Sequence, residues 1–453
     1  MRTQASSTLY FDFSGASMVK IVKDYRVKYQ AFSDLLDANP QVLALAHRDW
    51  ARLLSTSAKG RSGYTSEQLL RALIVMFLEG QDYRGTVIQI ENCEFLRHFV
   101  RLGIKPMMDY TFLNKAYGVL SPGTLQAMND AVSQYAVEQG KITGDKQRLD
   151  TTVYETNIHY PTDSSLLGDS FRTVARLVRD IQKELPHLGL QHRFHERKVK
   201  KLATFISRNA AHKNKSTRRA VKRHYHRLIH SVRWIHGVGQ QVLRQVIFHG
   251  EAAPDLAHYL PLVARIVAQT QQRVIAGVML PADEKLYSLF EEHTELIQRG
   301  KAGKPIEFGH KILLSQTGEK FIHYYQVLKK WVEDPDLLPG ALKAHQKLFG
   351  QFPDVAATDK GFYTSMNQIA ELEKKIATVS IAKKGRRTPA EYRRETSAAF
   401  SAGQRFRAGC EGSISVLKRA FKLGKCFFKG FKHYAASVGL AVLCHNLVLL
   451  TRL

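Results

Sequence analysis

The chain has 453 residues, of which 44% are hydrophobic, and a formal net charge of +27. This composition excludes a disordered chain, and the length allows about three domains. The excess of positive charge predicts a polyanionic partner. No two of the four cysteines form a Cys-x-x-Cys pair, which argues against a zinc ribbon and is typical of a reduced cytoplasm.

Residues 1–140 are predicted to form an all-helical domain. Apolar residues recur at helical spacing from Leu69 to Leu78, directly after the capping candidates Thr65 and Ser66. Two further helical patterns follow, and Gly-containing turns join them. Short helices joined in this way are compatible with a helix-turn-helix or with a plain bundle, and periodicity alone does not separate the two.

The pattern changes to strand-forming residues near position 145, and the first candidate functional residue, Asp150, lies in this strand. Asp150 lies between Leu149 and Thr151 in a run of β-branched and aromatic residues, where Asp is disfavoured. By alternation, Asp150 and Tyr154 share one face of this strand and Leu149 lies on the other. Asp150 is therefore either a solvated edge residue or a carboxylate that a rigid strand holds for chemistry.

Residues 163–300 are predicted to be a helical insertion with concentrated positive charge. From His192 to His236 the chain has fourteen Lys or Arg residues, seven histidines and one acid, Glu196. The charge is either a solvated helix face or a phosphate-binding surface, and its one-sidedness favours phosphate. The apolar spacing predicts packing against another helix, in this chain or in a second copy. Six of these cations, named here the six arm cations, are Lys213, Lys215, Arg218, Arg219, Lys222 and Arg223.

Residues 141–162 and 301–453 are together predicted to form an α/β domain. A strand hairpin turns at residues 316–319, a helix follows, and a fourth strand ends at Asp359. After another helix and strand, one long helix runs from about Pro389 through Glu411. The apolar stretch 435–450 is predicted to be a buried helix and not a membrane span, because it is short and contains His445 and Asn446.

Three acids of this domain, Asp150, Asp359 and Glu411, are expected to meet at strand ends and a neighbouring helix. Three carboxylates supply hard oxygen ligands for one or two Mg²⁺ ions. Arg407 and Lys418 lie four residues before and seven after Glu411, within about 40° of it around a helix. They are either surface ion-pair partners or phosphate-binding groups beside the metals.

The sequence around these acids resembles the bacterial insertion-sequence transposases of the DDE superfamily. "LDTTVYETNIHYPTDSSLLGD" and "ATDKGFYT" resemble the motifs of the first and second Asp, and "RFRAGCEGSISVLKRAF" resembles the Glu helix. The signature of that helix is Tyr, two residues, Arg, three residues, Glu, six residues and Lys. Arg407, Glu411 and Lys418 match it, whereas Gln404 stands at the Tyr position.

The resemblance implies a ribonuclease-H-like mixed sheet flanked by helices. It is weakest in the basic helical insertion, which in this chain is predicted to follow the first strand, whereas several relatives have an insertion before the Glu helix. The resemblance also implies that Asp150, Asp359 and Glu411 are catalytic and bind two Mg²⁺ ions, for which Mn²⁺ can substitute. Arg407, Lys418, the six arm cations and the N-terminal helices are expected to contact double-stranded DNA.

A cytoplasmic, nucleoid-associated protein without a membrane segment is expected, acting as a homodimer on DNA. Two alternatives stay open: a nuclease of the same fold without strand transfer, and a non-catalytic DNA-binding derivative. Inverted repeats flanking the gene would favour transposition over the first alternative.

Overall fold

The computed structural model describes residues 19–53, 63–298 and 305–453. It divides into unit 1, Met1–Glu155 with His310–Leu453, and unit 2, Thr156–Gly309. The described residues form a mixed α/β fold with a seven-stranded sheet in the order β2-β3-β1-β5-β6, in which β4 also pairs with β3 and β7 with β1. The predicted α/β class is confirmed at this level.

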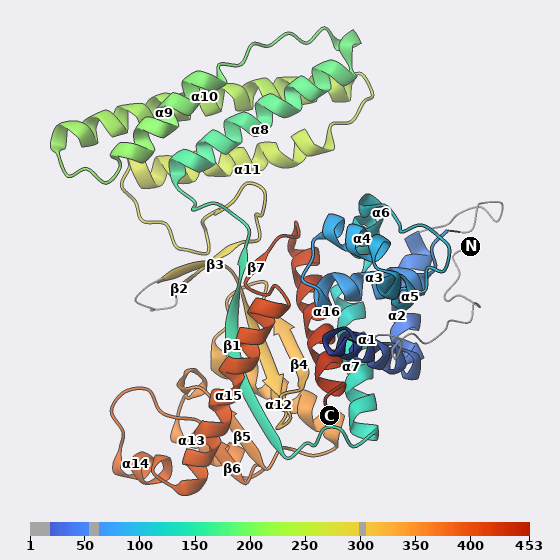
Figure 1. Ribbon diagram of the computed structural model, residues 1–453. Coiled ribbons are helices and arrows are strands. Elements are labelled where there is room, and N and C mark those ends of the chain that lie inside the picture. Colours follow the sequence, from blue (N-terminus) through green and yellow to red (C-terminus); the bar gives the residue numbers. More distant parts are fainter. Residues whose placement is uncertain (1–18, 54–62, 299–304) are drawn as a thin grey trace. The chain divides into compact units, whose positions relative to one another are not determined.

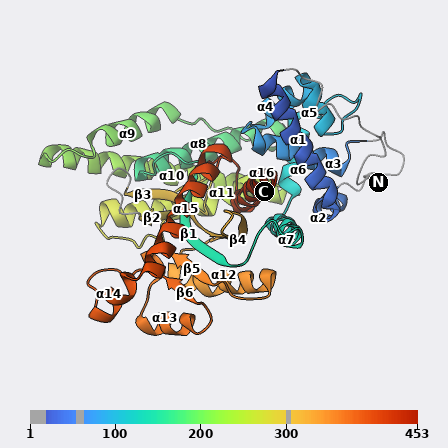
Figure 2. The ribbon, with the colours of Figure 1, turned by 60° about the horizontal axis from the view of Figure 1, so that its bottom comes forward.

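All seven described elements up to residue 138 are helices, as the sequence predicted. They are α1 (Lys20–Ala38), α2 (Pro40–Leu53), α3 (Ser66–Leu78), α4 (Tyr83–Asn92), α5 (Glu94–Phe99), α6 (Tyr110–Val119) and α7 (Pro122–Glu138). Thr65 caps α3 through a reciprocal pair of hydrogen bonds with Gln68. These helices share one hydrophobic core with the C-terminal helix, so the expected boundary at residue 140 falls inside unit 1 (Figures 1 and 2).

The sheet combines parallel and antiparallel strands. Its members are β1 (Lys146–Thr156), β2 (Glu295–Gln298), β3 (Ile306–Gln316), β4 (Ile322–Val327), β5 (Val355–Thr358), β6 (Thr378–Ser380) and β7 (Lys425–Cys426). The predicted hairpin is confirmed, because β3 and β4 pair antiparallel. The prediction of helix up to residue 300 is wrong at its end: β2 lies there, too short for its periodicity to be recognised. Asp359 therefore follows the fifth strand and not the fourth.

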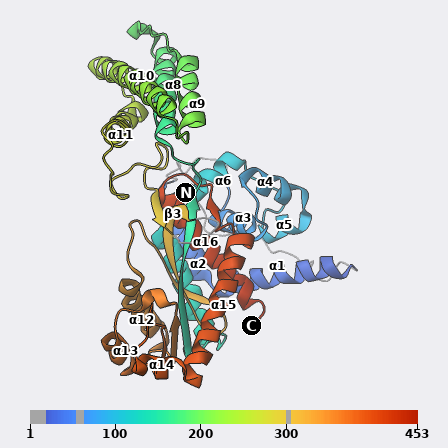
Figure 3. The same ribbon diagram turned by 90° about the vertical axis from the view of Figure 1, so that its left-hand side faces the viewer.

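Helices cover both faces of the sheet (Figure 3). On one face, α12 (Asp334–Phe349) and α13 (Met366–Glu373) pack in a core that includes Leu149 of β1. On the other face lie α15 (Ala398–Ala420) and α16 (Phe431–Leu450), in a core that includes Tyr154. The alternation predicted for β1 is thus confirmed, since Leu149 and Tyr154 belong to different cores.

Two predictions concern the C-terminal helices. The single helix expected from Pro389 is in fact two, α14 (Pro389–Glu395) and α15, because the Ser397 side chain caps α15 and restarts the helix. The buried C-terminal helix is confirmed. α16 is long and apolar enough to cross a membrane, but 83% of its most apolar window is buried inside the protein. Asn446, at 0% exposure, donates to the Ile322 carbonyl and to Asn129 Oδ1, which explains a polar residue in this helix.

Unit 2 is built on four helices that pack side by side: α8 (Asp163–Glu184), α9 (Glu196–Asn209), α10 (Lys215–Phe248) and α11 (Pro254–Thr270) (Figure 1). Apolar residues of all four, among them Phe171, Ile206 and Val232, share one core. The predicted apolar seam is therefore packed within this chain. Gly239 permits this packing, because a Cβ there would lie 2.8 Å from Leu260 Cδ2.

Candidate active site

Asp150 and Asp359 become neighbours through the parallel pairing of β1 with β5. Leu149 pairs with Thr358 in this register, and both strands run in the same direction. The residue after each of these two is an acid, so Asp150 and Asp359 lie side by side at the end of the paired segment. Adjacent strands lie about 4.8 Å apart, which brings the two carboxylates into each other's field.

The backbone after Asp359 is shaped by its own side chain. Asp359 Oδ1 accepts the Gly361 N–H at 2.5 Å and caps a short 3₁₀ turn, Lys360–Phe362. A Cβ on Gly361 would lie 2.6 Å from that oxygen and 2.6 Å from Asp334 Oδ2, so a larger residue there would have to displace both carboxylates. Asp334 in turn pairs with buried Lys311 at 2.6 Å. Sequence reasoning missed Asp334 and Lys311, because no local pattern connects them to Asp359.

Glu411 is linked to Asp150 through Arg407. One Arg407 nitrogen donates to Glu411 Oε1 at 3.0 Å, and the other donates to Asp150 Oδ2 at 3.3 Å. Both residues lie on α15, four positions apart, as the sequence predicted. The pairing is more than a surface i,i+4 contact, since the same guanidinium reaches β1. The structure therefore brings all three predicted acids together.

The electrostatics of Asp150 follow from its burial. Asp150 is 8% exposed, and burial raises the pKa of its carboxyl from 3.8 to about 6. Arg407 opposes this rise, whereas the carboxylates of Asp359 and Glu411 add to it. Its Oδ1 accepts the N–H of Thr151 at 2.8 Å. The Asp150 carboxylate is thus held in one orientation, with one cation and two further acids close to it.

Two side-chain tethers fix the elements that carry the acids. Gln404 Nε2 donates to the Ser380 carbonyl at 2.7 Å and to the Thr358 carbonyl at 3.4 Å, which links α15 to the ends of β6 and β5. Arg148, 3% exposed, donates to the Phe406 carbonyl at 3.0 Å, which links α15 to β1. The amide at position 404 therefore connects α15 to the ends of two strands. Tyr stands at this position in the transposase signature that the sequence resembles. Neither tether was predicted, because each joins segments far apart in the sequence.

The donor set fits a divalent metal in chemical type. Three carboxylates offer the hard oxygen ligands that Mg²⁺ prefers. Within the described part of the chain, no three His, Cys, Asp or Glu side chains already form a metal-binding group. Arg407 instead bridges Asp150 and Glu411. Each of these two carboxylates keeps one oxygen that Arg407 does not contact.

The remaining predicted residues are partly or fully exposed to solvent. Lys418 is partly exposed on α15, on the helix that carries Glu411. All fourteen Lys and Arg residues between His192 and His236 are exposed, which includes the six arm cations. Lys222 also donates to the Ile275 carbonyl at 3.0 Å. In unit 2 the positive charge is thus presented outward, opposite the apolar core.

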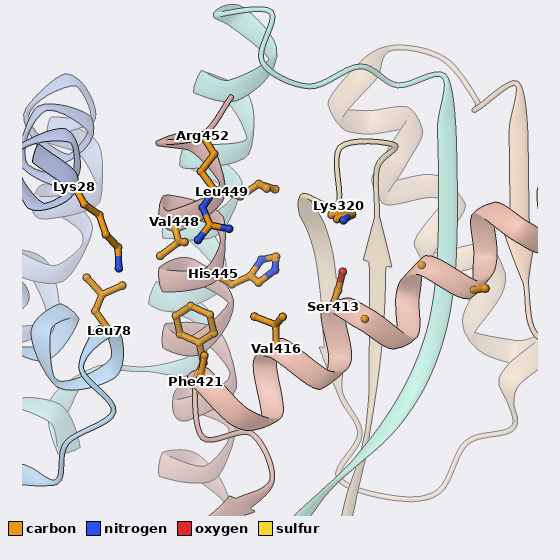
Figure 4. Close-up of a pocket in the computed structure, with 14 residues that line it drawn as sticks. Lys28, Leu78, Lys320, Ser413, Val416, Phe421, His445, Val448, Leu449 and Arg452 are labelled. Carbon is orange, nitrogen blue, oxygen red and sulfur yellow. The ribbon is translucent and has the colours of Figure 1, made fainter. Parts of the chain in front are cut away.

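A separate cleft of about 550 Å³ lies beside α15, and Glu411 is not among the residues that line it (Figure 4). Its walls are mostly apolar and include Val416 and Val448, and three cations, Lys28, Lys320 and Arg452, line it as well. None of the residues predicted from the sequence lines this cleft. The three acids therefore lie outside this cleft.

Comparison with known proteins yields no relative. No protein-family model, no curated protein and no solved structure matches the chain.

Proposed function

We propose that this protein is a DNA transposase of the DDE superfamily with a ribonuclease-H-like catalytic domain. It binds the terminal inverted repeats of an insertion sequence, cleaves phosphodiester bonds with Mg²⁺ and joins the 3′-ends to target DNA. The observation that carries the proposal is the convergence of Asp150, Asp359 and Glu411. The parallel register of β1 and β5 aligns Asp150 with Asp359, and Arg407 links Glu411 to Asp150.

In this proposal the three acids hold Mg²⁺ or Mn²⁺. A metal bound by these acids would activate a water or 3′-hydroxyl and would stabilise the departing 3′-oxygen. Arg407 holds the carboxylates in position before the metal binds and, with Lys418, contacts phosphate near the scissile bond afterwards. Gln404 and Arg148 keep α15 in register with the strand ends. The protein works in the bacterial cytoplasm, on the nucleoid, and is a homodimer in the DNA complex.

The decisive experiment uses a DNA fragment that carries the ends flanking the gene. Asp359→Ala and Glu411→Ala are expected to abolish Mg²⁺-dependent cleavage while binding to the same fragment persists. Asp354→Ala is the matched control, because Asp354 is an exposed acid just before β5. A variant of either acid that cleaves at the normal rate removes that residue from the site.

The same reaction separates the alternatives. A transposase gives strand-transfer products when target DNA is present, whereas a nuclease of the same fold gives only cut ends. A non-catalytic derivative gives neither, although it binds the fragment. The complete set of three acids argues against the non-catalytic derivative.

A further inference from the structure

One segment of unit 1, separate from the three acids and from the basic insertion, combines aromatic and positively charged side chains. Proteins bind single-stranded nucleic acids with these two kinds of side chain. Residues Lys422–Lys432, named here the aromatic-lysine segment, read "KLGKCFFKGFK" and contain four lysines, three phenylalanines and no acid. The segment follows α15 and includes β7, which pairs with β1 (Figure 1). It therefore lies against the strand that carries Asp150.

The segment forms one wall of a cleft of about 450 Å³. Aromatic rings line much of it, and they come from four elements or connections: Phe77, Tyr83, Tyr154, Phe427 and Phe428. Phe428 is fixed in place, with its ring 6.1 Å from that of Phe77 and 6.0 Å from that of Tyr83. Phe427, by contrast, is 69% exposed. A rigid aromatic floor thus stands beside a ring that solvent can reach.

Polar groups at the cleft complement a nucleotide. Lys422 and Lys425 line it beside one acid, Asp82, whose Oδ1 already accepts the Gly85 N–H at 2.7 Å. The Tyr83 hydroxyl is buried and has no hydrogen-bond partner among the described residues. The lysines suit phosphate, and the hydroxyl suits the polar edge of a base.

We propose that this cleft binds unpaired nucleotides of a DNA strand, with a base against Phe427 and Phe428 and the backbone on Lys422 and Lys425. Bases of a duplex are stacked on one another, so only unpaired bases can offer their faces to aromatic rings. That the ligand is DNA rests on the proposed function. The cleft adds a binding site for single-stranded DNA near the three acids.

The cleft lies close enough to the three acids for one DNA strand to reach both. Tyr154 lies four residues beyond Asp150 on β1 and on the same face, which corresponds to about 13 Å along the strand. A strand held at the cleft can therefore run to the acids within about four stacked nucleotides, at about 3.4 Å each. The cleft would hold the unpaired end of a DNA strand near the scissile phosphate.

The test measures binding without cleavage. A fluorescein-labelled single strand of ten thymidines and a duplex of random sequence are each titrated with the full chain in EDTA, and fluorescence anisotropy gives the affinity. Phe427→Ala is expected to weaken single-strand binding by about 5- to 150-fold, the range for loss of one stacked base. Duplex affinity should stay within about twofold. Phe427→Trp should keep single-strand binding, since it retains a stacking face.

Tyr392→Ala is the matched control, because Tyr392 is a 59% exposed aromatic of unit 1 far from this cleft in sequence. Equal effects of Phe427→Ala and Tyr392→Ala would overturn the proposal, as would equal losses for single strand and duplex. The readout is independent of the acids. If the Asp359 and Glu411 variants cleave normally, the proposed function fails while this binding assay still decides the cleft.

Discussion

Replacement of Asp150 by Asn tests the electrostatics of the candidate site directly. In the unfolded chain Asp150 ionises near pH 3.8, and in the folded protein burial raises its pKa to about 6. Because the folded state disfavours the charged form, Asp150 stabilises the fold fully only below pH 3.8. This contribution is lost as the pH rises through 6. From the two pKa values, the loss is about 1.6 kcal/mol at pH 5 and about 3 kcal/mol at pH 8.

Asn cannot ionise, so Asp150→Asn avoids this loss. It also gives up the hydrogen bond from Arg407, which is worth about 1 kcal/mol. The net expectation is a gain in unfolding free energy of roughly 2 kcal/mol at pH 8 and roughly 0.6 kcal/mol at pH 5. Urea denaturation in EDTA at the two pH values measures it, with Asp24→Asn, an exposed acid of α1, as the control.

Mg²⁺ extends the same experiment. It should raise the melting temperature of the wild-type protein at pH 8 and leave that of Asp150→Asn nearly unchanged, because the variant lacks one carboxylate ligand. A variant no more stable than wild type at pH 8, or a difference independent of pH, would refute the reasoning. Asp150 would then ionise as an ordinary surface acid.

Three further predictions concern DNA contacts and the tether. Lys418→Ala should reduce the slope of log affinity against log salt by about one unit, and an unchanged slope with an unchanged cleavage rate would leave Lys418 without a phosphate contact. Neutralising the six arm cations together should lower that slope by about five units and weaken specific and random duplexes by similar factors, as measured by anisotropy. A loss confined to inverted-repeat DNA would instead make the basic insertion a sequence reader, and no loss would make it a solvated face. Gln404→Ala should increase the Mg²⁺ concentration for half-maximal cleavage, because α15 loses its link to the end of β5. The affinity for duplex DNA should stay constant. A change in stability alone would limit Gln404 to a structural role.

Local sequence determined the elements that depend on neighbouring residues. The capping pair at Thr65 and Gln68, the β3–β4 hairpin and the alternation of β1 all arise from spacings of a few residues. The break between α14 and α15 was missed, although Ser397 is a capping residue, because helix formers on both sides conceal a two-residue interruption.

The sequence also identified Asp150, Asp359 and Glu411 as a set, because each acid stands in a motif or at the end of a strand pattern. Only the tertiary structure decided how they meet. The β1–β5 register aligns the two aspartates, and Arg407 reaches from α15 to β1. The tethers of Gln404 and Arg148, and the aromatic cleft beside β7, join residues separated by tens to hundreds of positions. Periodicity describes which face a side chain occupies, but packing of distant elements determines what it touches.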